Sequence, residues 1–145
     1  MNDEVFIKKG FLISTDKNLL NVDVIFNYLN DDSYWSQGIR RDVLEKGIAN
    51  SMCFGVYQQD VQAGFARVVT DNATFGYLCD VFILPEFRQK GLSKWLVQTI
   101  VKHPDLQGLR NQYLQRPKEF VGPDCGSAGT LAWQGGVKGI PICGQ

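Results

Sequence analysis

The sequence lacks several features that would assign it to other classes of protein. Its four cysteines (Cys53, Cys79, Cys125 and Cys143) include no C-x-x-C pair, and a single histidine accompanies them. The spacing typical of a structural zinc site is therefore missing, and we expect free thiols and no metal. The 15 basic residues balance the 15 acidic residues, which leaves no overall field to attract nucleic acid or an anionic membrane.

Long apolar runs are also missing, and the start Met-Asn-Asp-Glu does not resemble a secretory signal, so we expect no membrane span. Unpaired cysteines then predict a cytoplasmic protein. A chain of 145 residues with 44% apolar residues is sufficient for one hydrophobic core, which predicts a single compact unit.

The periodicity of apolar residues predicts a mixed α/β (α+β) protein. Helical spacing and strand-like runs alternate along the first three quarters of the chain, and neither pattern continues beyond Leu114. In chain order, the predicted elements are a strand over Val5–Ile13, helices over Asn18–Leu29 and Arg41–Ala49, strands over Met52–Tyr57, Ala63–Thr70 and Thr74–Leu84, and a helix over Leu92–Lys102.

The turn before the last predicted helix is the segment most indicative of chemistry. It reads Arg88-Gln89-Lys90-Gly91-Leu92-Ser93. The first N–H groups of a helix have no intrahelical partner and can bind a phosphate, aided here by the helix dipole and by Arg88, Lys90 and Lys94. A glycine at position 91 would let the phosphate approach closely. Taken alone, the turn is equally consistent with a simple connector.

The wider segment from Asp80 to Leu96, DVFILPEFRQKGLSKWL, resembles the acetyl-CoA signature of the GNAT superfamily of N-acetyltransferases. That signature is a hydrophobic strand, Pro-Glu with an aromatic residue, and R/Q-x-x-G-x-G/A opening a helix. Further segments similar to a small bacterial branch of this superfamily are Ser33–Trp35, Cys53–Tyr57, Gly64–Asp71 and His103–Arg110. We therefore divide the chain into a GNAT acetyltransferase-like domain over 1–110 and an atypical segment over 111–145.

The resemblance implies a mainly antiparallel central sheet with a splayed strand pair, flanked by helices. It also implies acetyl-CoA as the acyl donor and the amine of a small molecule or peptide as the acceptor, and it leaves the oligomeric state open, a homodimer included. Main-chain groups of Phe82 and Ile83 would meet the pantetheine arm. The pyrophosphate would rest on the N–H groups of Gln89, Lys90, Gly91, Leu92 and Ser93. The cations Arg88, Lys90 and Lys94 would assist.

Three further residues are candidates for the chemistry of transfer. An ammonium acceptor must lose a proton, and Asp80 is the candidate base because desolvation in an apolar strand makes a carboxylate more basic. The alternative is that Asp80 only accepts structural hydrogen bonds. Tyr34 and Trp35 follow a helix-breaking turn, where they would either line the acceptor site or serve as core aromatics.

The segment after Arg110 departs from the branch. A Leu-Ala-Thr strand, a tyrosine-bearing helix and Phe-Gly-Phe normally follow, whereas this chain continues with Asn111-Gln112-Tyr113-Leu114. The tyrosine that protonates the thiolate in many relatives has no counterpart. A one-base frameshift near Asn111 would account for the change, and a diverged carboxyl-terminal region would look the same. The sequence thus allows an active N-acetyltransferase, a non-catalytic acetyl-CoA-binding domain or, ranked last, an interaction domain without a cofactor.

Overall fold

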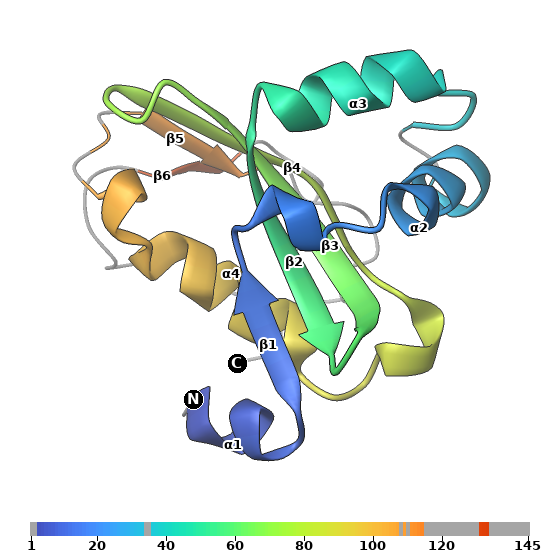
Figure 1. The fold of residues 1–145 in the computed structure, drawn as a ribbon. Coiled ribbons are helices and arrows are strands. Elements are labelled where there is room, and N and C mark those ends of the chain that lie inside the picture. The colour runs from blue at the N-terminus through green and yellow to red at the C-terminus, as the bar shows by residue number, and fades with distance from the viewer. Residues whose placement is uncertain (1–2, 34–35, 108, 110, 115–130, 134–145) are drawn as a thin grey trace.

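The computed structural model describes residues 3–33, 36–107, 109, 111–114 and 131–133. Over these residues, six strands form one sheet in the order β1-β2-β3-β4-β5-β6. Neighbouring strands are antiparallel except β4 and β5, which run parallel (Figure 1). The strands are β1 (Phe11–Ser14), β2 (Met52–Gln58), β3 (Val61–Thr70), β4 (Phe75–Ile83), β5 (Asn111–Leu114) and β6 (Leu131–Trp133).

Helices cover both faces of this sheet. The α-helices are α1 (Asp3–Lys8), α2 (Val22–Asn27), α3 (Arg41–Ala49) and α4 (Leu92–Lys102), and a π turn (Tyr28–Asp32) continues α2. Helices α1 and α4 share one hydrophobic cluster with the sheet, and α2 and α3 share a second cluster on the other face. The bounds of α3 and α4 agree with the predicted helices. None of the helices in the described part of the chain has the length and apolar character needed to span a bilayer.

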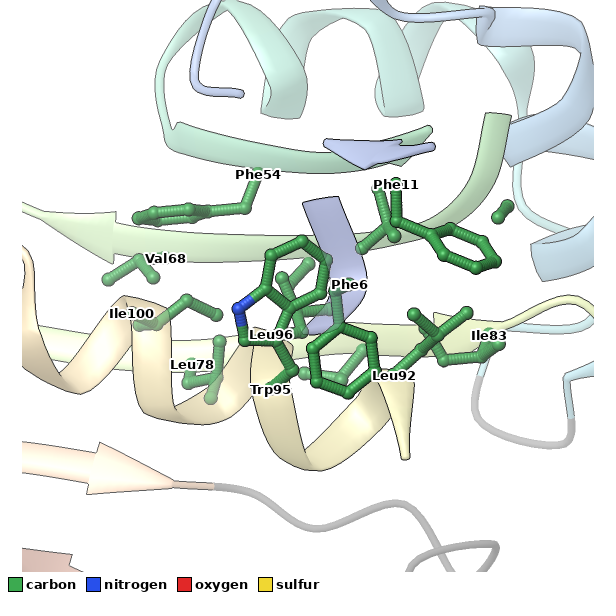
Figure 2. Close-up of a cluster of buried hydrophobic side chains, with 14 of the residues drawn as sticks. Phe6, Phe11, Phe54, Val68, Leu78, Ile83, Leu92, Trp95, Leu96 and Ile100 are labelled. Atoms are coloured by element: carbon green, nitrogen blue, oxygen red, sulfur yellow. The ribbon is translucent and has the colours of Figure 1, made fainter. Parts of the chain in front are cut away.

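The first cluster packs α4 against the middle of the sheet (Figure 2). Residues at alternate positions of β2 and β3 point to the same face, so Phe54, Val56 and Val68 meet the apolar side of α4. Helix α1 adds Phe6, whose ring stacks on Trp95 with 4.6 Å between centroids and 9° between planes. Each buried side chain of this size contributes about 1.5–3 kcal/mol to folding. This packing fixes the position at which α4 begins.

The predicted first strand, Val5–Ile13, is wrong over its first half. Residues Asp3–Lys8 form α1, and only Phe11–Ser14 pairs with β2. The helix ends where Gly10 takes a left-handed conformation with φ of +81°. Stacking of Phe6 on Trp95 stabilises a short helix here. The local alternation of apolar and polar residues carries no information about that distant partner.

The predicted helix over Asn18–Leu29 is divided into three pieces. A 3-10 turn spans Lys17–Leu19, α2 then begins after Asn21, and the π turn follows α2. The Asn21 side chain accepts a hydrogen bond from the Val24 N–H at 3.3 Å, which is the usual N-cap contact. A capping residue inside an apolar pattern therefore marks a helix start that periodicity alone does not detect.

The segment predicted to be atypical contributes to the same sheet. Strand β5 pairs with the first part of β4, from Phe75 opposite Asn111 to Leu78 opposite Leu114, and β6 pairs with β5. Residues 111–114 thus form a strand at the point where the related branch has its Leu-Ala-Thr strand.

Candidate active site

In the described part of the chain, β4 is paired with β5 over its first half. Over the described residues, their pairing stops at Leu78, whereas β4 remains paired with β3 as far as Ile83. The second half of β4 therefore has one side against β3 and one side without a paired strand in the described part of the chain. Main-chain groups on a strand side without a paired strand can bind an extended ligand as an added strand would.

A bulge in β4 follows the last described pair with β5. Between the pairs Phe65–Phe82 and Arg67–Cys79, β3 advances by two residues and β4 by three. Asp80, inside the bulge, has a φ of +54°, which is the left-handed region that asparagine and aspartate tolerate better than most residues. A bulge locally bends a strand and increases its twist, and bulges are common next to active sites.

The Asp80 side chain is held by an ion pair. Its Oδ2 accepts a hydrogen bond from the Arg67 Nε at 2.8 Å, and the Arg67 Nη1 donates to the Ser51 Oγ at 3.0 Å. The side chains of Asp80 and Arg67 are 9% and 21% exposed, so the pair is largely shielded from water. This contact agrees with the alternative reading of Asp80 as an acceptor of structural hydrogen bonds, and it leaves the role of base as a prediction.

Strand alternation decides which main-chain groups of β4 face the open side. The Leu84 N–H donates to the Ala63 carbonyl at 2.8 Å, so the main-chain groups of Leu84 point toward β3. The main-chain groups of Phe82, two positions earlier, also point toward β3. Those of Ile83 and Val81 point away from β3. The sequence prediction named Phe82 and Ile83 as the residues whose main-chain groups meet the ligand. It missed Val81, because the direction of main-chain groups follows from the register and not from the side chains.

The turn before α4 has the geometry of an anion site. Gly91 is the N-cap of α4, with a φ of +81° and no side-chain capping bond, and Gln89 is also left-handed with a φ of +64°. The Trp95 N–H donates to the Gly91 carbonyl at 3.1 Å, which is the first bond of the helix. The N–H groups of Leu92 and Ser93 precede that bond and thus have no intrahelical partner.

A hollow of about 190 Å³ lies over this helix start and the end of β4. It joins the two features, because its lining comes from the end of β4, the turn and the first residues of α4. Most of the predicted cofactor-binding residues are in that lining, and Phe82, Lys90 and Lys94 are not. The lining residues are Ile83, Phe87, Arg88, Gln89, Gly91, Leu92 and Ser93.

Arg88 makes contacts that sequence reasoning did not foresee. Its Nε donates to the Ile83 carbonyl at 3.0 Å, and its Nη2 donates to the Tyr28 Oη at 2.9 Å. The guanidinium therefore bridges the end of β4 and the helix layer on the α2 side. Tyr34 and Trp35, the predicted acceptor-site residues, lie outside the described residues.

Comparisons with known proteins identify the family of this chain. The sequence model of the acetyltransferase (GNAT) family matches residues 22–117. A GNAT-family protein of Xanthomonas campestris pv. campestris has 43% identity and a TM-score of 0.71, covering 73% of this chain and 75% of that one. The fold is thus that of a GNAT acetyltransferase.

Two other similarities are informative. A protein of Gibberella zeae, provisionally named an acetyltransferase, is 36% identical in an alignment of 109 residues that covers 62% of this chain and 62% of that protein. The chain thus spans less than two thirds of the length of that relative. A GNAT acetyltransferase of Elizabethkingia anophelis, solved with acetyl-CoA bound, has a TM-score of 0.54 at 8% identity over 72% of this chain and 64% of that one, a likeness of fold alone. The chain belongs to the acetyltransferase (GNAT) family.

Proposed function

We propose that this protein is an N-acetyltransferase that transfers the acetyl group of acetyl-CoA to the amine of a small molecule or peptide. The observation that carries the proposal is the junction of two features in one hollow. The end of β4 and a helix start that is capped by a left-handed glycine line the same hollow. An extended arm with a pyrophosphate at its end fits such a junction.

In this proposal, the main-chain groups of Val81 and the N–H of Ile83 hold the pantetheine arm. The N–H groups of Gln89, Leu92 and Ser93 receive the pyrophosphate at the positive end of the α4 dipole. Acetyl-CoA supplies a thioester, from which the acceptor nitrogen takes the acetyl group while the C–S bond breaks. A strand amide would stabilise the negative charge that develops on the carbonyl oxygen.

Proton transfer is the less supported part of the proposal. The amine must lose a proton and the leaving thiolate must gain one. Asp80 is our candidate base, at the bulge beside the open side of β4. Tyr34 and Trp35 are our candidates for the acceptor site. A cytoplasmic location is also still a prediction, which rests on the unpaired cysteines.

A non-catalytic acetyl-CoA-binding domain is the second candidate function. The observation in its favour is that the sequence carries no counterpart of the tyrosine-bearing helix that follows the fifth strand in the related branch. Binding without turnover would then be the outcome, so binding and activity require separate measurements.

The first test is calorimetric titration of the protein with acetyl-CoA, comparing the wild type with Gly91→Glu. A carboxylate at this position should repel the pyrophosphate, and we expect binding to be lost. The matched control is Gly10→Glu, because Gly10 has the same φ of +81° and nothing within 4 Å of an added Cβ. The control carries the same backbone strain at a remote place and should bind normally.

Absence of binding by a folded wild type would overturn the proposal and both candidate functions with it. Binding that Gly91→Glu retains would move the cofactor away from this turn. If Gly91→Glu alone loses binding, turnover is measured next with a panel of amines, by release of the free thiol of CoA. Thiol release then identifies the enzyme, and binding without any thiol release identifies the non-catalytic domain.

A further inference from the structure

Tyr28 connects the helix layer that contains α2 to the turn before α4. It begins the π turn that continues α2 and is 2% exposed. Its ring stacks on Phe82 of β4 with 4.0 Å between centroids and 14° between planes. Its hydroxyl accepts the bond from Arg88, although the two residues are 60 positions apart in the sequence. One buried side chain therefore contacts both β4 and the turn.

The backbone around Tyr28 is itself fixed. The Ser33 N–H donates to the Tyr28 carbonyl at 2.9 Å, and the Ser33 Oγ donates to the Leu29 carbonyl at 2.6 Å. Ser33 and Leu29 are fully buried. The π turn is thus closed by hydrogen bonds at its end, which limits the freedom of the Tyr28 ring. π turns within helices are frequently found at functional sites.

Arg88, in contrast, has an exposed side chain on the turn, and an exposed arginine normally samples many rotamers. Here the guanidinium donates one bond to the Ile83 carbonyl and one to Tyr28. A guanidinium has five N–H donors, so three are left for a further acceptor. Because Arg88 lines the hollow over the helix start, an anion bound there lies within the range of this cation.

We propose that Tyr28 is a positioning residue of the cofactor site, whose hydroxyl holds the Arg88 guanidinium in place for the pyrophosphate. This inference rests on the proposed function. A cation that is already oriented loses less conformational entropy on binding than a free one, and pre-organisation of this kind increases affinity. The planar, forked guanidinium suits the task, because it can bond Ile83, Tyr28 and a phosphate at once.

The test compares Tyr28→Phe with the wild type by calorimetric titration with acetyl-CoA. Phenylalanine keeps the ring that stacks on Phe82 and removes only the hydroxyl, so we expect the fold to be retained and the Kd to rise about fivefold. The matched control is Tyr57→Phe. Tyr57 is also buried, and its hydroxyl has no hydrogen-bond partner among the described residues, so this variant should keep the wild-type Kd.

A double-mutant cycle with Arg88→Met tests whether Tyr28 acts through Arg88. In the Arg88→Met background, Tyr28→Phe should have no further effect on the Kd, because the group that it positions is gone. A wild-type Kd for Tyr28→Phe, or an equal loss of affinity in both backgrounds, overturns the inference while the cofactor site stands. A wild type that does not bind acetyl-CoA overturns the proposed function instead.

If Tyr28→Phe melts at too low a temperature for titration, Arg88→Lys carries the test. An ammonium keeps the charge and loses the fork, so it cannot bond Ile83 and Tyr28 while facing a phosphate as the guanidinium does. We then expect a rise in Kd of about fivefold. A Kd equal to that of the wild type overturns the inference.

Discussion

Replacement of Asp80 by asparagine separates the structural role of this residue from the catalytic one. Asparagine tolerates the left-handed backbone that Asp80 adopts, with its φ of +54°, so the substitution removes the charge and adds little strain. The Arg67 guanidinium then loses the carboxylate that it contacts at 2.8 Å. An amide oxygen can still accept one hydrogen bond in the same place.

The expected loss of stability follows from the burial of this pair. Removing one partner of a fully buried ion pair costs about 3–5 kcal/mol. Arg67 keeps 21% of its side chain exposed, and the amide still accepts a bond, so we expect about 1–3 kcal/mol for Asp80→Asn. Asp80→Ala should cost about 1–2 kcal/mol more, because alanine is strained in the left-handed region. Urea unfolding at pH 7 measures both variants.

Arg67→Met and the double variant with Asp80→Asn complete a double-mutant cycle for the ion pair. If the ion pair stabilises the bulge, the two single losses exceed what the double variant loses, with a coupling free energy of about 1–3 kcal/mol. A coupling below about 0.5 kcal/mol would refute the structural reasoning, because contacting residues that act together are not additive.

Kinetics decide the catalytic role, provided that turnover is found. A general base contributes about 10²–10⁴-fold, so Asp80→Asn should lower kcat/KM by at least about 100-fold. Arg67→Met, which disturbs the bulge and keeps the carboxylate, should have a much smaller effect. A folded Asp80→Asn variant that keeps kcat/KM within about threefold of the wild type, a change too small for general-base catalysis, excludes Asp80 as the base.

Two further predictions concern packing and buried thiols. At Gly64, an added Cβ would lie 2.5 Å from the Ile83 Cδ1 and 2.8 Å from the Phe82 carbonyl oxygen, so Gly64→Ala should displace β4, cost about 1–3 kcal/mol in urea unfolding and weaken acetyl-CoA binding. Unchanged stability would mean that β3 and β4 are less tightly spaced than the structure has them. Burial raises the pKa of Cys53 to about 11 and the pKa of Cys79 to about 12. Both thiols should therefore resist iodoacetamide at pH 8 in the folded protein, as peptide mass spectrometry would detect, whereas modification as fast as in urea would contradict this burial. An unfolded thiol has a pKa of about 8.5, so the stability that these protonated thiols provide is complete below that pH and is lost as the pH rises through the folded values.

Helices α3 and α4 could be predicted from the sequence because their signals are local. Their apolar residues recur with helical spacing, and Pro104 follows the end of α4. Helix α1 could not be predicted, because six residues provide too little periodicity and the stabilising partner of Phe6 is Trp95, far along the chain. Strand β5 is similar: its four residues have no pattern of their own, and pairing with β4 defines them.

Some features of the candidate site could be predicted from the sequence, and others required the tertiary structure. The sequence by itself determined the turn around Gly91 and the apolar strand before it, because a left-handed glycine at a helix start and a buried strand are requirements on neighbouring residues. Only the tertiary structure decided that the main-chain groups of Val81 and Ile83 point away from β3. It also decided that Asp80 pairs with Arg67 and that Arg88 donates a hydrogen bond to Tyr28. These facts depend on strand register and on contacts between distant segments, which residue spacing along one chain does not specify.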